Sequence, residues 1–585
     1  MNTASRASLA LLFIPLTTAI ACGGPEVLDP IDDSPSPEPE VDEPIDDEDP
    51  TPDDPIIIEP PDDEELELPT GFVVDCTAPE AVDCDGNTFY GDLNVFTAAD
   101  LAPLSGATCM VGNLSVSAST LMSLSGLESL RQVDGHVGIS SNQNLISLTG
   151  LENLQVVTKS FEVINNDELV DLDGLDALYA VGGLRVQNND GVTDLQGLVG
   201  LTHVSGDLFV SFMPKIENLL GLDCVGAIDG EVSITRNPKL ESLDGLNRLE
   251  EVSDQVDISE NRLLVDVEAL GALEAIGGHL FIEENEALVD INGLSNLTTV
   301  GGVVSISWHA ALAHIVGFDA LTQVGALTIE SNPELVAIEM PSLTTVDGTL
   351  GVRANTSLAD VTGLAAVSSV GIDLLIDRNT SLTSLGGFES LQTVGRQILI
   401  DLNDALVDVD GLAQITHVPA TLDITWNPSL TDLSGLQNLV SAFNLGIRFN
   451  AGLQDFSLDS LTTVEETMLI VMNDALKSFS MDALETVGLG LSVRKNPELL
   501  SFAVDGLSSI GTDLIISENF TLQDLGFTSL ASVGGWVGVT ENCALEIDNV
   551  SSELDSVDAV SDGWCVWNSA SFCPDNAGYD GNCAQ

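Results

Sequence analysis

A motif of the form x-Leu-x-x-Leu recurs every 22 to 24 residues through most of the chain, and this period limits the possible folds more than any other feature. The first copy is Asp100-Leu-Ala-Pro-Leu104 and the last begins at Gly526, which gives nineteen units. A period in this range is typical of a solenoid, in which a repeat buries its apolar face only against its neighbours.

Each unit also carries a Leu-x-Ile core, as in Leu327-Thr-Ile329, whose alternation predicts a short strand with one buried face. A pair of glycines often precedes this core and supplies a tight corner. The pattern predicts an all-β fold: a right-handed parallel β-helix or solenoid of about nineteen 22–24-residue coils.

An asparagine follows the strand core by three residues in sixteen units, and Ser119, Met213 and His309 occupy the same slot in three others. Where the backbone leaves the sheet, its N–H and C=O groups lose their ladder partners, and an amide side chain can satisfy both kinds of group. Stacked coils would place these amides about 4.8 Å apart. The expected structural ladder consists of Asn142, Asn166, Asn189, Asn237, Asn261, Asn285, Asn332, Asn355, Asn379, Asn403, Asn427, Asn450, Asn473, Asn496, Asn519 and Asn542.

A leucine-rich-repeat horseshoe is the alternative fold, but its signature places Asn-x-Leu where this chain has Asn-x-x-Leu. That spacing resembles the receptor L-domain family of β-helices, as does Cys84 followed by Cys109-Met-Val-Gly-Asn-Leu-Ser-Val116. The resemblance covers about residues 80–545 and implies a disulfide-capped first coil. The cysteine-rich modules, membrane span and kinase of growth-factor receptors are missing here, so hormone binding does not transfer.

The N-terminal region has the features of an exported protein. Residues 1–21 resemble a secretory signal peptide, with an apolar run around Leu9–Leu16. Ala19-Ile20-Ala21 before Cys22 fits an ordinary cleavage site and also resembles a bacterial lipobox, which implies lipidation of Cys22. Residues 25–70 hold 12 Pro, 20 Asp+Glu and no Lys or Arg, so we expect 22–70 to be a disordered, lipid-anchored stalk.

The remaining boundaries follow the cysteines and the period. We expect a disulfide N-cap and first coil over 71–112, solenoid repeats over 113–545, and a cysteine-rich C-terminal cap over 546–585. Without Cys22 the cysteine number is eight, an even number suited to an oxidising compartment. The disulfide candidates are Cys84, Cys109, Cys543, Cys565, Cys573 and Cys583, while the pairing of Cys76 and Cys224 stays open.

The net charge of the chain limits the classes of molecule that it can bind. The formal net charge is −76, with 16 Lys+Arg against 92 Asp+Glu, so nucleic acid is excluded as a partner because phosphates require clustered cations. We expect an unknown protein or glycan ligand, and membrane contact only through the lipid anchor.

No catalytic, cofactor-binding or metal residues are predicted. The six histidines are dispersed, and no hydrolase elbow, P-loop or dinucleotide motif is present. A polysaccharide-degrading β-helix enzyme is the alternative, but the carboxylates are too numerous to single out a pair. Arg353, Arg448 and Arg494 share one outward strand column and are expected simply to solvate that face.

Two positions of the repeat are expected to place a recurring type of side chain at the surface. An aspartate five residues after the asparagine slot either accepts hydrogen bonds from turn amides, the preferred interpretation, or shares calcium with its neighbours; its members are Asp171, Asp194, Asp266, Asp290, Asp360, Asp408, Asp432, Asp455 and Asp524. The outward position within Leu-x-Ile is rarely charged. It is either a contact surface or ordinary exposed sheet.

The resulting interpretation is a cell-surface lipoprotein, in the outer membrane or secreted, with a rigid repeat rod for binding, adhesion or envelope architecture.

Overall fold

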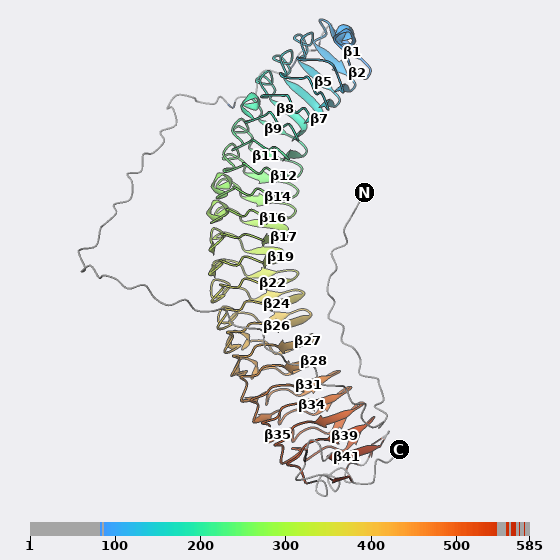
Figure 1. Ribbon diagram of the computed structural model, residues 1–585, viewed down its shortest axis with the longest axis vertical. Helices are drawn as coiled ribbons and strands as arrows, with labels where there is room; N and C mark the ends of the chain where they lie inside the picture. Colours follow the sequence, from blue (N-terminus) through green and yellow to red (C-terminus); the bar gives the residue numbers. More distant parts are fainter. Residues whose placement is uncertain are drawn as a thin grey trace, which may run out of the picture. The chain divides into compact units, whose positions relative to one another are not determined.

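A computed structural model of the chain describes residues 76, 82, 84, 87–546, 557, 559–560, 563–568, 573 and 578–579. The expected signal peptide, the stalk with Cys22, and most of the C-terminal cap, Cys583 included, lie outside the described residues. Figure 1 shows the described part as coils stacked in sequence order. The predicted parallel β-solenoid is confirmed, and a leucine-rich-repeat arrangement is also consistent with the stack.

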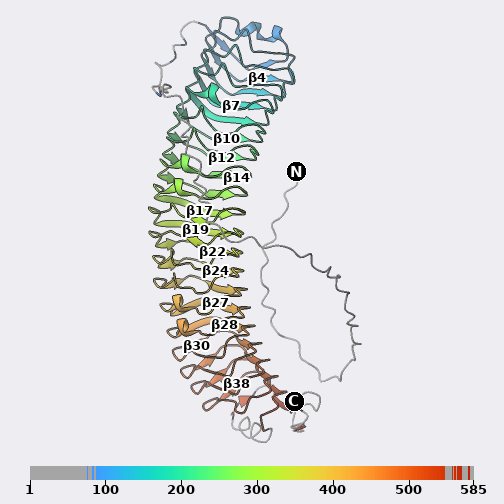
Figure 2. The same ribbon diagram turned by 60° about the vertical axis from the view of Figure 1, so that its left-hand side comes forward.

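The Leu-x-Ile cores form one wall of a 37-stranded sheet in which consecutive coils pair in parallel (Figure 2). Leu327 and Ile329, for example, pair in register with Leu350 and Val352 of the next coil. This wall contains β2 (Leu93–Val95), β4 (Leu114–Ser117), β6 (Val137–Ser140), β7 (Val156–Ile164), β8 (Ala180–Gln187), β10 (Leu208–Ser211), β12 (Val232–Thr235), β14 (Val256–Ser259), β16 (Leu280–Glu283), β17 (Thr299–Ser307), β19 (Gln323–Glu330), β22 (Leu350–Arg353), β24 (Asp373–Asp377), β26 (Gln397–Asp401), β27 (His417–Thr425), β28 (Ser441–Arg448), β31 (Met468–Val471), β34 (Leu491–Arg494), β37 (Leu514–Ser517), β39 (Val537–Thr540) and β41 (Trp564–Asn568), with β42 (Gly578–Tyr579) antiparallel to β41.

A second, shorter strand precedes the glycine corner in most coils and fuses with the first in β7, β8, β17, β19, β27 and β28. These short strands are β1 (Thr88–Tyr90), β3 (Cys109–Val111), β5 (Gln132–Asp134), β9 (His203–Val204), β11 (Ala227–Ile228), β13 (Glu251–Val252), β15 (Ala275–Ile276), β21 (Thr345–Val346), β23 (Ser369–Val370), β25 (Thr393–Val394), β30 (Thr463–Val464), β33 (Thr486–Val487), β36 (Ser509–Ile510), β38 (Ser532–Val533) and β40 (Ala559–Val560).

The remaining side of each coil holds the x-Leu-x-x-Leu motif, mostly as turns. Short 3-10 helices form there: η1 (Ala98–Leu104), η2 (Gln196–Leu198), η3 (Glu268–Leu270), η4 (Asn292–Leu294), η5 (Asp410–Leu412) and η6 (Ser434–Leu436). Two small sheets pair β18 (His314–Ile315) with β20 (Ala337–Ile338), and β29 (Asp455–Ser457) through β32 (Ser478–Ser480) to β35 (Ser501–Ala503).

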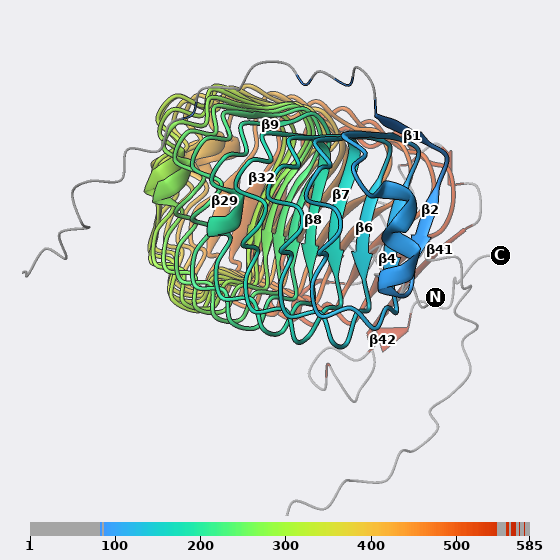
Figure 3. The same ribbon diagram turned by 90° about the horizontal axis from the view of Figure 1, so that it is seen from above.

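Seen along the stack, each coil follows the path of the one before it (Figure 3). The inward leucines, isoleucines and valines therefore form one continuous apolar core along the solenoid, and most of them are completely buried.

The asparagine ladder lies at the corner where the Leu-x-Ile strand ends. The Asn332 side chain donates to the Ile306 carbonyl of the previous coil (3.1 Å) and accepts from the His309 N–H (3.1 Å). Its own N–H donates in turn to Asn355 Oδ1 (3.0 Å). All sixteen ladder asparagines are buried, so each amide satisfies backbone groups that the turn removes from the sheet.

The residue before every ladder slot, from Ala118 to Glu541, has a positive φ of 46–66°. None of these nineteen residues is glycine, although the left-handed region costs an L-residue about 1–2 kcal/mol. The rung hydrogen bonds hold the corner in this conformation. We name these nineteen positions the corner column.

Two substitutions in the ladder have different consequences. Met213 donates its N–H to Asn237 Oδ1 (3.0 Å) but has no side-chain oxygen to accept from the coil before it. His309 fills its slot with ring nitrogens lying 2.9 Å from the Ile282 carbonyl and 3.1 Å from the Asn285 carbonyl. Burial lowers the pKa of His309, which favours the neutral ring.

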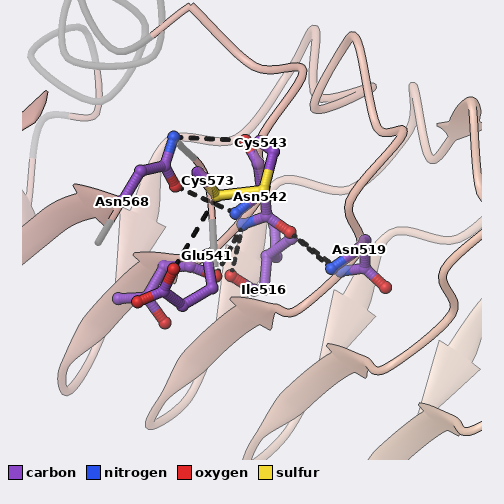
Figure 4. The surroundings of a disulfide bond; sticks show 8 residues. Ile516, Asn519, Glu541, Asn542, Cys543, Asn568 and Cys573 are labelled. Atoms are coloured by element: carbon purple, nitrogen blue, oxygen red, sulfur yellow. Dashed lines mark hydrogen bonds between the residues drawn. A yellow bond between two sulfur atoms is a disulfide. The ribbon is translucent and has the colours of Figure 1, made fainter. Parts of the chain in front are cut away.

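Three disulfides join cysteines that are both described, two in the N-terminal part of the solenoid and one at its C-terminal end. Cys84 bonds to Cys109, and Cys76 bonds to Cys224 across a sequence separation of 148 residues, which pairs the two cysteines whose partners were left open. At the other end, Cys543 bonds to Cys573 next to a further rung, Asn568, which accepts from the Asn542 N–H at 3.0 Å (Figure 4). Asn568 extends the ladder beyond the predicted last rung.

Candidate functional site

The distribution of arginines identifies one region of the exposed sheet face. Between Arg262 and Lys477 the chain has only four Lys and Arg residues, and each of these arginines binds an aspartate on β24 or β27. We name this cluster the arginine–aspartate patch; it consists of Arg353, Asp373, Asp377, Arg378, Arg396, Asp401, Asp423 and Arg448. Four arginines and four aspartates make a formally neutral region on a strongly acidic protein.

Asp377 occupies the centre of the patch and is only 1% exposed. Its Oδ2 accepts from Arg353 Nε of the previous coil at 2.6 Å, and its Oδ1 accepts from Arg378 Nη1 at 2.5 Å. Both carboxylate oxygens are thus neutralised by charge-assisted hydrogen bonds, which are stronger than neutral ones.

Two further pairs flank this centre. Arg396 binds both oxygens of Asp373, and this hydrogen bonding raises the pKa of Arg396. Arg448 binds both oxygens of Asp423 on the preceding coil. Burial raises the pKa of Asp423, although the arginine opposes that rise. Gly446 leaves the space for this second pair, because a Cβ there would lie 2.4 Å from Asp423 Oδ1.

Asp401 differs from the other three aspartates because no arginine binds it directly. Its Oδ1 is buried and has no hydrogen-bond partner in the described part of the chain. Burial raises the pKa of Asp401 to about 6, and the nearby Asp377 carboxylate adds to that rise. A fraction of this carboxyl is therefore protonated near neutral pH.

An apolar edge adjoins the patch. Four consecutive members of the corner column after Arg378 are Leu402, Trp426, Phe449 and Met472. Trp426 and Phe449 stack with ring centroids 4.2 Å apart and an interplanar angle of 6°. Trp426 remains 50% exposed. We name these four residues the apolar edge.

The sequence analysis identified the column of arginines in this site but did not predict their ion pairs with aspartates. The shared outward column is present, since β22 to β34 place Arg353, Arg448 and Arg494 in register. The interpretation that these arginines only solvate the face was wrong, because Arg353 and Arg448 bind buried aspartates. Asp373, Asp377, Arg378, Arg396 and Asp401 went unnoticed, although aligning the repeats by their asparagines would have placed Asp377 and Asp401 beside the arginines.

The recurring aspartates form a different arrangement. Oδ1 accepts from the N–H two residues later in eight of the nine, at 2.7 Å for Asp432 and 3.0 Å for Asp194. Asp455 is the exception because it belongs to β29. Within the described ranges, no group of three or more His, Cys, Asp or Glu side chains is arranged to hold a metal ion.

Comparison with known proteins adds little to this geometry. No known protein family matches the chain, and no characterised protein matches it in sequence. Solved structures that match include one described as "Crystal structure of TLR13-ssRNA13 complex", with 15% identity, 80% of this chain and 82% of that chain covered, and a TM-score of 0.17. A score this low carries no argument about this chain. In the described part, no helix has the length and apolar character to cross a membrane.

Proposed function

We propose that this protein is a cell-surface lipoprotein, anchored through Cys22, that binds a macromolecular partner with the exposed face of its long sheet. The observation that supports this is the arginine–aspartate patch together with the apolar edge. Without Arg6 and the 20 acidic residues of the stalk, the chain has 72 Asp+Glu and 15 Lys+Arg, which is a formal net charge of −57. A surface whose charges are paired does not repel a partner as the rest of this acidic protein does. A partner can therefore displace water from it at a lower cost.

The receptor L-domain resemblance and the disulfides are consistent with export. Disulfides persist in extracellular and periplasmic compartments and are rare in reducing ones. Cys76–Cys224, Cys84–Cys109 and Cys543–Cys573 would therefore suit a protein displayed outside the cytoplasm.

The chemistry of the surface favours a protein partner over a neutral glycan. Tryptophan, arginine, phenylalanine and methionine are enriched at the centres of protein interfaces. The stacking of Trp426 on Phe449 covers one face of each ring, which leaves less ring face open to a sugar. A sugar that binds by stacking needs an open ring face.

The experiment uses the purified full-length chain immobilised at its N-terminus and exposed to solubilised envelope proteins and to a glycan array. Trp426→Ala is compared with Trp308→Ala, because both tryptophans occupy the corner column and are 50% and 58% exposed. A partner that is lost with Trp426→Ala and Arg378→Gln but kept with Trp308→Ala supports the proposal. A partner that tolerates both patch variants refutes it.

One observation favours a second candidate, a polysaccharide-degrading enzyme. A carboxyl with a pKa near 6 beside an ionised carboxylate is the arrangement used by general-acid catalysts, and Asp401 beside Asp377 has this character. Release of reducing sugar from a panel of acidic and neutral polysaccharides, abolished by Asp401→Asn, would establish this alternative. Unchanged polysaccharides would leave binding as the function.

A further inference from the structure

A polar groove of about 310 Å³ lies on the same sheet face far along the chain from the patch, over β7, β8 and β10. A β-bulge shapes it. Val157 pairs with Val181 and Ser160 pairs with Gly183, so two residues of β7 oppose the single Gly182 of β8. The bulge turns Lys159 outward, and a Cβ at Gly182 would lie 2.7 Å from the Lys159 Cα, so only glycine fits.

Two cations, Lys159 and Arg185, line this groove. Lys159 and Arg185 form no ion pair within the described residues, although the protein is strongly acidic. The Arg185 guanidinium lies 4.1 Å above the Phe209 ring and donates to Gln187 Oε1 at 3.2 Å. These contacts hold its planar fork over the groove, where the fork can bind a carboxylate with two hydrogen bonds.

Two carboxylates complete the lining, and each is held by a donor of its own. Glu162 Oε1 accepts from Ser160 Oγ (2.9 Å), which in turn contacts His136 Nδ1 at 2.7 Å. Asp207 Oδ1 accepts from the Glu231 N–H at 3.0 Å. Fixed carboxylates repel a simple anion, but they accept hydrogen bonds from hydroxyl groups.

We propose that this groove binds a sugar acid, namely a uronic-acid residue of a polysaccharide. Arg185 and Lys159 bind the sugar carboxylate, while Glu162 and Asp207 accept from ring hydroxyls. An extended peptide cannot add to this sheet by strand pairing, because β8 lies between β7 and β10 and both of its edges are already paired. The site is independent of the arginine–aspartate patch.

The test measures binding of an oligosaccharide of galacturonic acid to the full-length protein by calorimetry at 0.15 M salt, where the Debye length of about 8 Å limits the effect of distant charges. The methyl-esterified oligosaccharide, inorganic phosphate and an acidic peptide serve as comparison ligands. The free acid should bind, and esterification should weaken binding at least about tenfold, the loss expected for one charge-assisted hydrogen bond.

Variants connect the binding to the groove. Arg185→Gln and Lys159→Gln should each raise Kd about tenfold or more, and Arg262→Gln, an exposed arginine on another coil, should leave Kd unchanged. Glu162→Gln separates the two kinds of anion, because it should weaken a hydroxyl-bearing ligand and strengthen phosphate. Circular dichroism confirms that each variant is folded.

Several outcomes would overturn the proposal: no binding of the free acid, equal binding of its ester, equal competition by phosphate or the acidic peptide, or indifference to Arg185→Gln. The proposed partner at the patch is tested separately, since Trp426→Ala leaves this groove intact and Arg185→Gln leaves the patch intact.

Discussion

Asp377 and Asp401 are register partners on adjacent parallel strands, so two outward carboxylates lie one strand apart, and only Asp377 is bound by arginine. Like charges in directly opposed positions repel. Repulsion within the pair is reduced because Arg353 and Arg378 neutralise Asp377, while the pKa of Asp401 is raised to about 6.

The first prediction concerns pH. The folded pKa of Asp401, about 6, lies above its ordinary value of 3.8, so the folded state binds more protons than the unfolded state between these values. This group therefore contributes less stability as pH rises from 4 to 6 and is least favourable above 6. Asp377, Asp423, Arg378 and Arg448 are the charged groups that influence it.

Asp401→Asn should accordingly stabilise the protein at pH 8 by about 1 kcal/mol, a value reduced because the side chain is partly exposed to solvent. The gain should shrink at pH 4.5. Asp404→Asn, which removes the same charge from an exposed site on that coil, is the matched control. Thermal unfolding across pH measures both variants, and parallel profiles would contradict the assignment.

The second prediction concerns the buried charge of Asp377. The double variant Arg353→Gln/Arg378→Gln should destabilise the coils around β24 by about 3–5 kcal/mol, because it leaves a buried carboxylate unpaired. Adding Asp377→Asn should restore most of that loss. Hydrogen exchange of β22 to β26 provides the measurement, and failure of the rescue would show that the arginines act through packing instead.

The third prediction concerns the ladder. Asn332→Leu should leave the Ile306 carbonyl and the His309 N–H without partners, at about 1–3 kcal/mol for each buried group. Glu334→Leu, an exposed polar-to-leucine change two residues away, is the control and should alter the melting temperature little. Equal melting temperatures for the two variants would show that the ladder hydrogen bonds do not stabilise the fold.

The fourth prediction concerns calcium. Turn amides already bind the recurring aspartates, as Asp408 and Asp432 accept from Asp410 and Ser434 N–H groups at 3.3 and 2.7 Å. Millimolar Ca²⁺ should therefore raise the melting temperature no more than NaCl of matched ionic strength, through screening alone. A calcium-specific rise that disappears in Asp408→Asn/Asp432→Asn would refute this prediction.

The fifth prediction concerns the anchor. If a lipid on Cys22 holds the protein, Cys22→Ala should release it from the membrane fraction into the medium and abolish labelling by a fatty-acid probe. Cys76→Ser serves as a control that removes a different cysteine, one that the structure places in a disulfide. Membrane retention of the Cys22 variant would refute the lipoprotein assignment.

The repeat, the buried strand core and the asparagine rungs could be predicted from the sequence alone, because they depend on a local period and on hydrogen bonds that recur from coil to coil. Leu327 and Ile329 pair with apolar residues, and Asn332 bonds to another ladder position, one repeat away in either direction, so the pattern of one unit predicts the others. The last rung, Asn568, was not predicted because it lies 26 residues after Asn542, outside the 22–24-residue period.

The contacts between charged side chains could not be predicted from the sequence and became visible in the structure. Arg448 reaches Asp423 on the preceding coil because Gly446, opposite Asp423, has no side chain to block the contact, and Arg396 binds Asp373 along a diagonal. The pairing of Cys76 with Cys224 spans 148 residues and follows no repeat. Such contacts depend on side-chain direction and on the register between coils, which a one-dimensional period does not contain.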